Sequence, residues 1–568
     1  MQKLLRFLKP YTRYIVLGPF FKLLEAVFEL IVPVVMARII DIGIANRDTR
    51  YIWHMSIVLV ILGICGLGFA LTCQYFASKC AFAYGTDLRS ALFRHINTLS
   101  RTELDRLGTS TLINRITNDV TSSQQGVNMA IRLGTRAPFL VIGAIVMTLL
   151  IDWQLSLIFL IIAPILGVVL YCVLTRTIPM YTRNQQKLDV IARHTGESLD
   201  GVRVIRAFSK QQQETERFAQ ECADLEKSMI AAGRISAVLN PATFLIMNLG
   251  IATVLWFGGL QIDAGRLSQG DLTAFTNYMT QILLAGVQLA NLIQILTKAQ
   301  ASSLRVADVL ETHSTMQGGS AQVTDSREAI CFDHVSFTYA GAPHPALENI
   351  SFTLQKGQTL GIIGGTGSGK STLAQLIMRG YDATEGTIRV FGQDVKSFDL
   401  DALNRAIGYV PQKALLFTGT IEENLRWADE NAPKENLRRA LEIAQASDFV
   451  DKLQYGMQTR LVQGGRNLSG GQKQRLTIAR ALSGSPEMLV LDDSMSALDY
   501  ATDAALREQL HTRCQGMTKV VISQRATSLR DADLILVMED GKCVGQGTHE
   551  ELLKTCEVYH EIYATQNT

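Results

Sequence analysis

A run of glycines that ends in a lysine and a serine is well suited to phosphate chemistry. Residues Gly364–Ser371 read GGTGSGKS and match the pattern GxxxxGK[ST], between the apolar stretch Leu360–Ile363 and the helix-forming stretch Thr372–Met378. A loop between a strand and a helix can turn its backbone N–H groups inward on phosphate groups. Lys370 is predicted to reach the β- and γ-phosphates of a nucleotide, and Ser371 to bind Mg²⁺. The other residues assigned to nucleotide contact here are Gly364, Gly367, Gly369 and Thr372.

An acidic residue stands at the end of a short apolar run later in the sequence. Met488–Leu491 are four apolar residues, and Asp492 follows them. A buried strand that delivers a carboxylate at its carboxyl edge has this form, and such a carboxylate holds Mg²⁺ in P-loop enzymes. A carboxylate that only caps a helix is the alternative, but it does not explain the phosphate loop in the same chain.

The elements that must position these residues differ between the two halves of the 568-residue sequence. After about residue 300, short apolar stretches alternate with glycine-rich turns and amphipathic stretches. Before it, long apolar runs dominate, and six of them reach the ~20 residues that a helix needs to cross a bilayer. These predicted spans are residues 14–39, 53–77, 133–151, 155–174, 241–260 and 272–296.

The connections between the spans predict the orientation of the chain in the membrane. Residues 79–136 and 176–234 are rich in Arg and Lys, as is the N-terminus, so these parts are predicted to face the cytoplasm. Two connections of this length are too long for simple turns. Their helical periodicity predicts that the membrane helices continue as rods into the cytosol.

Composition limits the class of protein further. Nine Cys are scattered without a CxxC pair or a Cys/His cluster, which favours free thiols over a metal site. The net charge of +2 gives no indication of nucleic acid binding. We predict a transmembrane domain at residues 1–300, a linker at residues 301–327 and a nucleotide-binding domain at 328–568. The stretch 311–327 of the linker is rich in Ser, Thr, Gly and Gln.

The segment Leu468–Gln472, LSGGQ, is the point at which the chain resembles a known family. LSGGQ is the signature of ATP-binding-cassette (ABC) proteins, and the resemblance extends over the whole chain. It implies an all-α transmembrane domain followed by an α/β P-loop cassette with a helical subdomain. It also implies ATP and Mg²⁺ as ligands, and a second half-transporter whose ATP is contacted by this signature. The signature residues carried over are Ser469, Gly470, Gly471 and Gln472.

Further motifs follow in the order that the family shows. Tyr339 resembles the aromatic residue on which adenine stacks, Gln412 the Q-loop residue beside Mg²⁺, and Asp499 the D-loop aspartate. In the membrane half, Arg115–Asp119 resembles the end of the first cytoplasmic loop of ABC exporters, and Gly201–Phe208 resembles the second. Such loops carry short coupling helices that press into grooves on the nucleotide domains. Six spans fused to one cassette resemble an exporter-type half-transporter.

Two residues depart from the family pattern. Asp493 stands where most active cassettes have a Glu that acts on the attacking water, and Gln524 stands where they have a switch His. Losing a methylene draws the carboxylate back by about 1.5 Å, and misplacements of ~1 Å can cost ~10²-fold in rate. An amide cannot carry the charge of an imidazole or relay its proton. We therefore predict a slow, degenerate ATP site, which resembles one subunit of heterodimeric bacterial multidrug exporters.

Polar residues inside the predicted spans are candidates for the cargo cavity, because such residues are costly in lipid. The first span carries one group on one helix face and the sixth carries another along a stripe. Locking of neighbouring helices is the favoured explanation for the first group, and it explains the second group as well as a cavity lining does. The candidates are Lys22, Glu25, Glu29, Asn277, Gln281, Gln288 and Asn291.

We interpret the sequence as one half of an ABC exporter for small amphipathic molecules, with a non-identical partner that carries the intact Glu and His. Its expected location is a bacterial inner membrane, with the nucleotide domain and both termini in the cytoplasm. Three alternatives stay open: a homodimer with two slow sites, an exporter-fold importer, and an ATP-gated regulatory subunit that does not pump.

Overall fold

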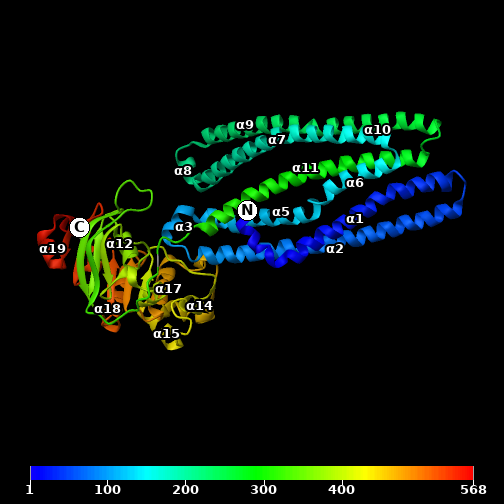
Figure 1. Cartoon of the computed structure of the whole chain (residues 1–568). Helices are drawn as coiled ribbons and strands as arrows, with labels where there is room; N and C mark the ends of the chain where they lie inside the picture. The colour runs from blue at the N-terminus through cyan, green and yellow to red at the C-terminus, as the bar shows by residue number, and fades with distance from the viewer. Residues whose placement is uncertain (1, 317, 567–568) are drawn as a thin grey trace. The chain divides into compact units, whose positions relative to one another are not determined.

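The computed structural model describes residues 2–316 and 318–566, which form two units (Figure 1). The first unit contains the residues up to Asn97 together with Ser110–Thr312. The second contains Thr98–Thr109 together with the residues from His313 onward. The first unit is helical, and the second contains β-sheets with helices between their strands. This confirms the predicted fold class of a helical membrane domain followed by an α/β domain.

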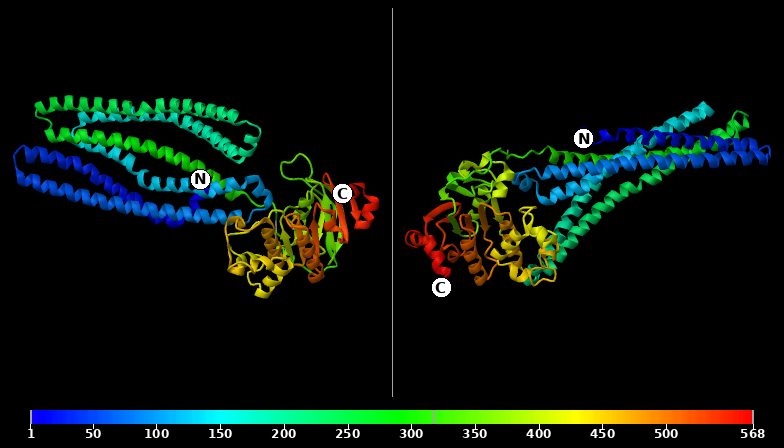
Figure 2. Two further views of the ribbon diagram at one scale, coloured as in Figure 1. Left: turned by 180° about the vertical axis from the view of Figure 1, so that it is seen from behind. Right: turned by 90° about the horizontal axis from the view of Figure 1, so that it is seen from below.

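Long helices run side by side along the first unit in all views (Figures 1 and 2). The helix α1 packs against α2, α7 packs against α9 and α10, and α11 packs against α5 and α6. The helices are α1 Thr12–Arg38, α2 Thr49–Ile96, α4 Thr109–Asn114, α5 Val120–Leu133, α6 Arg136–Ile151, α7 Trp153–Asp200, α8 Val202–Ala207, α9 Gln211–Ala237, α10 Leu239–Asp263 and α11 Gln269–Glu311, with π-helical turns at Ile39–Ile44 and Arg115–Asp119 and 3-10 turns at Gln2–Phe7 and Lys9–Tyr11.

Within the described residues, five helical stretches are long and apolar enough to cross a membrane. The predicted span 14–39 is not among them, although α1 is a helix of the expected length. The difference arises because α1 carries the charged residues Lys22, Glu25 and Glu29 within one short stretch. The five stretches are Thr49–Ile96, Thr109–Ile151, Trp153–Asp200, Gln211–Asp263 and Gln269–Glu311.

The helices start where polar side chains can satisfy the first backbone N–H groups. Asp48 accepts hydrogen bonds from the backbone at the start of α2, Asp152 does so for α7, and Ser268 for α11. The helices α2 and α7 each have 48 residues, or about 72 Å of length. This is more than twice the thickness of a hydrocarbon core. The membrane helices therefore continue as rods beyond the membrane, as predicted.

The rods of the first unit are joined by a buried carboxylate. Asp119 is 3% exposed and accepts a hydrogen bond from Arg115 at 2.8 Å and from the Nε of Arg305 at 3.1 Å. Burial alone would raise the pKa of Asp119, but hydrogen bonds from Arg305, Ser302 and Arg115 outweigh it and hold the pKa below its ordinary value. Asp119 thus fixes the π-helical turn Arg115–Asp119 to α11.

Replacing Asp119 with Asn should lower the thermal stability of the first unit. The change leaves the guanidinium groups of Arg115 and of the half-exposed Arg305 facing a neutral amide, and losing hydrogen bonds to a charged group costs about 2 kcal/mol. Because the pKa of Asp119 is lowered in the folded state, its stabilising effect is complete above about pH 4 and is lost as the pH falls through the folded pKa. Melting curves at neutral and acidic pH measure both effects. An unchanged melting temperature in D119N, or a fall equal to that of the exposed control Asp325→Asn, would contradict the assignment.

The second unit is built around two main sheets. The larger has the order β12-β11-β3-β10-β9-β6, in which β11, β3, β10, β9 and β6 are parallel, and the smaller is antiparallel with the order β2-β1-β4-β5. The strands are β1 Glu328–Phe337, β2 Leu347–Gln355, β3 Thr359–Gly364, β4 Glu385–Val390, β5 Gln393–Asp394, β6 Ile407–Val410, β9 Met488–Asp492, β10 Thr518–Ile522, β11 Leu534–Glu539 and β12 Lys542–Gly547, with a separate pair β7 Gly419–Thr420 and β8 Arg460–Leu461.

Helices cover the larger sheet and form a separate helical part. Buried residues of β3, β9 and β10 pack on both faces of the sheet, so these strands read as continuous apolar runs. The helices of this unit are α3 Arg101–Leu107, α12 Lys370–Ile377, α13 Leu400–Ala406, α14 Ile421–Leu425, α15 Lys434–Ile443, α16 Ser447–Val450, α17 Gly470–Ser483, α18 Tyr500–Arg513, α19 His549–Thr555 and α20 Glu557–Gln566.

Two boundaries differ from the expectation. The helix α11 continues to Glu311, so the predicted linker 301–327 is helical at its start. The sequence analysis matched Arg115–Asp119 to the end of a loop that carries a short helix, and this segment is a π-helical turn that leads into α5. The short helix before it, α3, was not predicted and belongs to the second unit. The second predicted loop, Gly201–Phe208, does contain a short helix, α8.

Candidate functional site

The loop between β3 and α12 brings the predicted phosphate-contacting residues together. Its backbone at Gly367 and Gly369 has φ values of 85° and 94°, which glycine adopts without strain. A Cβ on Gly369 would lie 2.7 Å from the carbonyl oxygen of Ala346, so no larger residue fits there without a shift. The loop therefore offers its backbone N–H groups to an anion at the N-terminus of α12.

Lys370 is buried at the start of α12. Its Nζ donates hydrogen bonds to the carbonyl oxygen of Gly364 at 2.9 Å and to the Oγ of Ser368 at 3.3 Å, and it also contacts the carbonyl of Gly365. Burial lowers the pKa of Lys370, and the carboxylates Asp493 and Asp492 partly oppose this. A buried ammonium group held by loop carbonyl oxygens can exchange them for phosphate oxygens.

Asp492 ends β9, which lies between β10 and β6 in the larger sheet. It is 3% exposed, and each of its carboxylate oxygens accepts a hydrogen bond from a hydroxyl group. The Oγ of Ser371 donates to Oδ1 at 2.8 Å, and the hydroxyl of Tyr409 donates to Oδ2 at 3.2 Å. Burial raises the pKa of Asp492, whereas these two hydrogen bonds lower it. Tyr409 was not anticipated from the sequence, because it lies within an apolar strand.

The donor set around Asp492 fits Mg²⁺. A serine hydroxyl and a carboxylate are hard oxygen ligands, which Mg²⁺ prefers, usually with one or two carboxylates and the phosphates of a substrate. The carboxylate is buried with its charged form disfavoured, so a divalent cation would offset that cost. Ser371 and Asp492 are already hydrogen-bonded to each other, and the amide of Gln412, the third residue predicted beside Mg²⁺, donates to the neighbouring Asp493.

The two glutamines predicted near the site converge on Asp493. Nε2 of Gln412 donates to Oδ2 of Asp493 at 3.2 Å, and Nε2 of Gln524 donates to the same oxygen at 3.3 Å. Burial raises the pKa of Asp493, and the hydrogen bond from Gln412 opposes the rise. The backbone of Asp493 has a φ of 45°, a left-handed conformation that Asp tolerates better than most residues. Asp493 is therefore held between two neutral amides.

The signature segment forms the N-terminus of α17. Ser469 caps this helix, since its hydroxyl accepts from the backbone of Gln472 and the side chain of Gln472 accepts from the backbone of Ser469. Ser469 and Gly470 are exposed, and a Cβ on Gly470 would meet no atom within 4 Å. The helix thus presents its positive end to the surface without a covering residue.

The remaining predicted residues lie around this arrangement. Asp499 caps α18 by accepting hydrogen bonds from Thr502, which lowers its pKa. The hydroxyl of Tyr339 lies 3.0 Å from Oγ1 of Thr372, and its ring meets that of Tyr381 edge to face. Tyr339 is therefore held beside the phosphate loop, where a base can stack on an aromatic ring.

Charged residues of the first predicted span are paired. Nζ of Lys22 lies 2.6 Å from a carboxylate oxygen of Glu25 within α1. Glu29 pairs with Arg136 of α6 at 2.8 Å, and Arg136 also donates to Gln288 of α11 at 2.7 Å. The sequence placed Arg136 at the end of a cytoplasmic loop. Arg136 also lies within the predicted span 133–151, and a charged residue inside a span usually pairs with an opposite charge, so the sequence did contain an indication of this contact.

The polar stripe of α11 is divided between packing and exposure. Nε2 of Gln281 donates to the backbone oxygen of Glu29 at 3.3 Å, so it joins α11 to α1. Asn277 donates to the backbone of its own helix at 3.0 Å and is exposed, as is Asn291. Gln281 and Gln288 thus lock helices, and Asn277 and Asn291 are the residues of the stripe that face outward from this chain.

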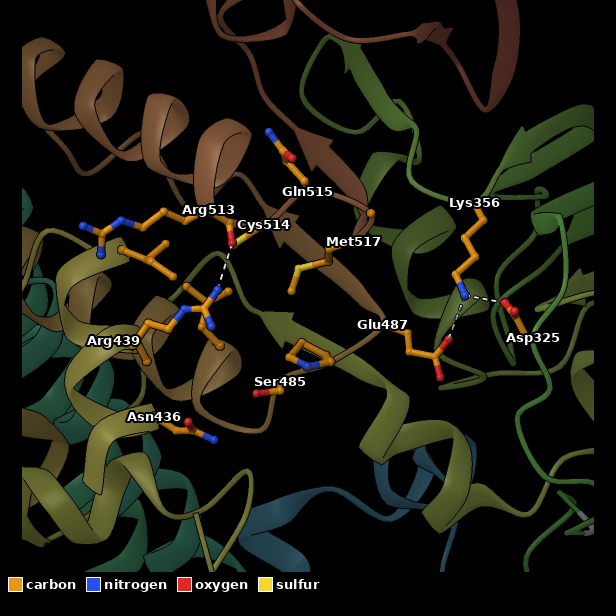
Figure 3. Close-up of a pocket in the computed structure, with 15 residues that line it drawn as sticks. Asp325, Lys356, Asn436, Arg439, Ser485, Glu487, Arg513, Cys514, Gln515 and Met517 are labelled. Carbon is orange, nitrogen blue, oxygen red and sulfur yellow. Dashed lines mark hydrogen bonds and ion pairs between the residues drawn. The ribbon is translucent and has the colours of Figure 1, made fainter. Parts of the chain in front are cut away.

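A cavity of about 420 Å³ lies elsewhere in the second unit (Figure 3). Arg439 donates to the backbone oxygen of Arg513 at 3.1 Å, and Arg513 pairs with Glu442 at 2.8 Å. Lys356 pairs with Asp325 and approaches Glu487. Protein oxygens already partner these three cations, and the cavity does not include the phosphate loop. We therefore assign the nucleotide to the loop and not to this cavity.

Comparisons with known proteins match both units. The family model of the ABC transporter transmembrane region matches residues 15–285, and that of the ABC transporter matches residues 347–496. A solved structure of a bacterial Atm1-family ABC exporter with ATP bound is similar with a TM-score of 0.83 and 22% sequence identity, over 98% of this chain and 99% of that one. This likeness shows the fold.

Curated relatives are similar over nearly the full length. An uncharacterized ABC transporter ATP-binding protein of Mycobacterium tuberculosis (strain ATCC 25618 / H37Rv) is 38% identical over 568 residues, which are 99% of this chain and 97% of the relative. A probable multidrug resistance ABC transporter ATP-binding/permease protein of Bacillus subtilis (strain 168), YheI, is 33% identical over 482 residues, which are 84% of this chain and 82% of the relative.

Proposed function

Because this chain belongs to the ABC transporters, and has the exporter-type arrangement of a transmembrane domain fused to one ATPase domain, we propose that it is one half of an exporter whose other half is a different chain. The observation that carries the proposal is the hydrogen bonding of Asp493, which occupies the position of the catalytic glutamate. Its carboxylate is held by the amides of Gln412 and Gln524, while the phosphate loop and the signature keep the family pattern.

The chemistry at Asp493 explains why its own site hydrolyses ATP slowly. A general base must reach the attacking water, and the aspartate carboxylate is shorter than a glutamate by about 1.5 Å. The amide of Gln524 can donate a hydrogen bond to the γ-phosphate. Unlike an imidazole, it cannot carry a positive charge or transfer a proton, so it stabilises the negative charge that develops there less well. ATP still binds here, because Lys370 and the loop glycines supply the phosphate contacts. This site therefore holds ATP and turns it over slowly.

The signature of this chain completes the fast site of the partner. Ser469 and Gly470 are exposed at the positive end of α17, a position that suits the γ-phosphate of ATP bound to a second chain. The partner supplies the glutamate base and the switch histidine. At the partner's ATP site, the signature of this chain therefore stabilises the transition state, and the partner provides the general base.

Two exposed surfaces of this chain also suit a second half-transporter. The short helix α8 and the residue after it expose Val204 by 59% and Phe208 by 72%. A groove of about 630 Å³ in the second unit is lined by residues that include Tyr409, Phe417 and Trp427. We assign the groove to the corresponding helix of the partner, and α8 to the groove of the partner.

ATP binding by both chains closes the nucleotide domains, and hydrolysis at the partner's site opens them again. Ser371 and Asp492 would hold Mg²⁺, which when bound neutralises phosphate charge. Lys370 binds the β- and γ-phosphates, and Tyr339 stacks on adenine. The coupling helices transmit closure to the membrane helices, so the cavity turns outward.

The proposed cargo is a small amphipathic molecule, drug-like or lipid-like. The charges of α1 are neutralised within the protein by Lys22–Glu25 and Arg136–Glu29, so they leave no strong net charge for a highly charged cargo. Asn277 and Asn291 offer polar contacts beside apolar helix surface. The location that suits this cargo is a bacterial inner membrane, with the nucleotide domain in the cytoplasm.

ATPase activity of the purified chain in lipid, alone and with a candidate half-transporter that carries the intact Glu and His, tests the proposal. We expect negligible hydrolysis by the chain alone and robust hydrolysis by the pair. Replacing the catalytic glutamate of the partner should remove the activity of the pair. Robust hydrolysis by the chain alone would instead establish a homodimer in which Asp493 and Gln524 suffice.

A further inference from the structure

Three polar side chains connect the short helix α3 to the carboxylate of Asp492. We propose that Tyr409 is a positioning residue for Asp492, and that Gln375 and Arg101 extend its hydrogen-bonded chain to α3, so that the seating of α3 controls metal binding at this site. The inference rests on the proposed role of Asp492 in holding Mg²⁺.

The contacts along this chain are direct. Arg101 of α3 donates through Nη1 to Oε1 of Gln375, which lies on α12. Nε2 of Gln375 donates to the hydroxyl of Tyr409 at 3.0 Å, and this hydroxyl donates to Oδ2 of Asp492 at 3.2 Å. The four residues belong to α3, α12, β6 and β9 of the same unit.

A glycine lies beside the first of these contacts. A Cβ built on Gly380 would lie 2.8 Å from Oε1 of Gln375 and 3.5 Å from Cδ of Arg101. Any side chain at residue 380 would therefore compete for the space in which the guanidinium meets the amide.

All the hydrogen bonds point in one direction, from a cation to an anion. The guanidinium of Arg101 polarises the amide of Gln375, and the amide polarises the hydroxyl of Tyr409. A hydroxyl polarised in this way is a better donor to a carboxylate. The orientation of Asp492 is thus coupled to whether Arg101 is in place.

Tyr409 is well suited to hold Asp492 while the nucleotide is bound. The other hydroxyl on Asp492 belongs to Ser371, which also has to serve Mg²⁺ and therefore has to change partners. Tyr409 holds the opposite oxygen and is not among the residues predicted to contact the phosphates. It can keep the carboxylate in one rotamer throughout the cycle.

A second link between α3 and the cassette leads elsewhere. The hydroxyl of Tyr381 donates to Asp105 of α3 at 2.5 Å, and Tyr381 packs against the ring of Tyr339. This link fastens the same helix by the same kind of bond, but its contacts among the described residues lead to Tyr339 and not to Asp492. It therefore provides a matched control in which the same hydroxyl is removed from a tyrosine.

The test measures the affinity of the full-length chain in lipid nanodiscs for a fluorescent ATP analogue, with Mg²⁺ and with EDTA. Tyr409→Phe should weaken binding in Mg²⁺ about fivefold to tenfold and leave binding in EDTA unchanged, because only the carboxylate loses a hydrogen bond. Tyr381→Phe should leave binding in EDTA unchanged and weaken binding in Mg²⁺ much less than Tyr409→Phe, because Arg101 still fastens α3 and Asp492 keeps both of its hydroxyl donors. Melting temperatures confirm that each variant is folded.

Two further variants test the direction of the hydrogen bonds that run from Arg101 to Asp492. Gln375→Glu replaces the amide donor with an acceptor that competes with Asp492 for the hydroxyl hydrogen of Tyr409, so binding in Mg²⁺ should weaken as in Tyr409→Phe. Arg101→Met should weaken it less, and its effect should disappear in a Tyr409→Phe background, because the chain is already broken there.

The outcomes separate this inference from the proposed metal site. If Mg²⁺ does not strengthen nucleotide binding in the unmodified chain, the role of Asp492 in holding Mg²⁺ is wrong. If Mg²⁺ strengthens it equally in the unmodified chain and in Tyr409→Phe, or if Tyr381→Phe has the same effect as Tyr409→Phe, the positioning role of Tyr409 is wrong.

Discussion

Replacing Gly470 with Asp should nearly abolish ATP hydrolysis by the assembled pair and leave this chain folded. Gly470 is the first residue of α17, where a Cβ meets no atom within 4 Å and a carboxylate is favourable to the helix dipole. The same carboxylate would stand where the γ-phosphate of the partner's ATP is proposed to lie. We expect a loss of ~10²–10³-fold in hydrolysis, the range for removing one stabilising donor from a transition state.

Three control variants distinguish the effect of the added charge at Gly470 from the effects of added bulk, of a charge elsewhere in the protein, and of damage to the other ATP site. Gly470→Ala adds only a methyl group and should cost much less. Gln211→Asp makes the same charge change at the first residue of α9, in the other unit, and should have no effect. Lys370→Ala damages the phosphate loop of the slow site, so the pair should keep a substantial part of its hydrolysis. If Lys370→Ala silences the pair and Gly470→Asp does not, the assignment of fast and slow sites is reversed.

Local motifs explain why much of the nucleotide site could be predicted from the sequence. The phosphate loop is continuous in the chain, and its glycines and Lys370 need only the strand before it and the helix after it. The same holds for Ser469, whose capping partner Gln472 lies three residues away. Long apolar runs likewise predicted most membrane helices, because span length is set by the bilayer and not by the rest of the fold.

Contacts between distant residues could not be predicted in this way. The partner of Arg136 is Glu29, which lies 107 residues earlier, and the partner of Tyr409 is Asp492, which lies 83 residues later. Neither pairing follows from periodicity, since each depends on which elements pack together. For the same reason the sequence did not identify α3, whose position in the second unit depends on Arg101 and Asp105 meeting residues of the cassette.

Restoring both missing groups should turn the slow site into a fast one. The double variant Asp493→Glu with Gln524→His is expected to raise ATP hydrolysis by the chain alone by about 10²-fold, because the carboxylate regains its reach and the imidazole can exchange a proton. Each single change should gain less. In the present site, both glutamine amides hold Oδ2 of Asp493, so removing only one leaves the other in place.

The variant Asp493→Asn with Gln524→His is the matched control, since it carries the histidine but no base and should show no gain. The left-handed backbone at Asp493 favours Asp over Glu, so a modest fall in melting temperature is expected in the active variant. Cross-linking of the chain in lipid shows whether two copies assemble, as the assay requires. If copies assemble and the double variant stays slow, then residues other than Asp493 and Gln524 limit hydrolysis, and the case for a non-identical partner loses its physical basis. If hydrolysis rises as expected, these two side chains account for the asymmetry.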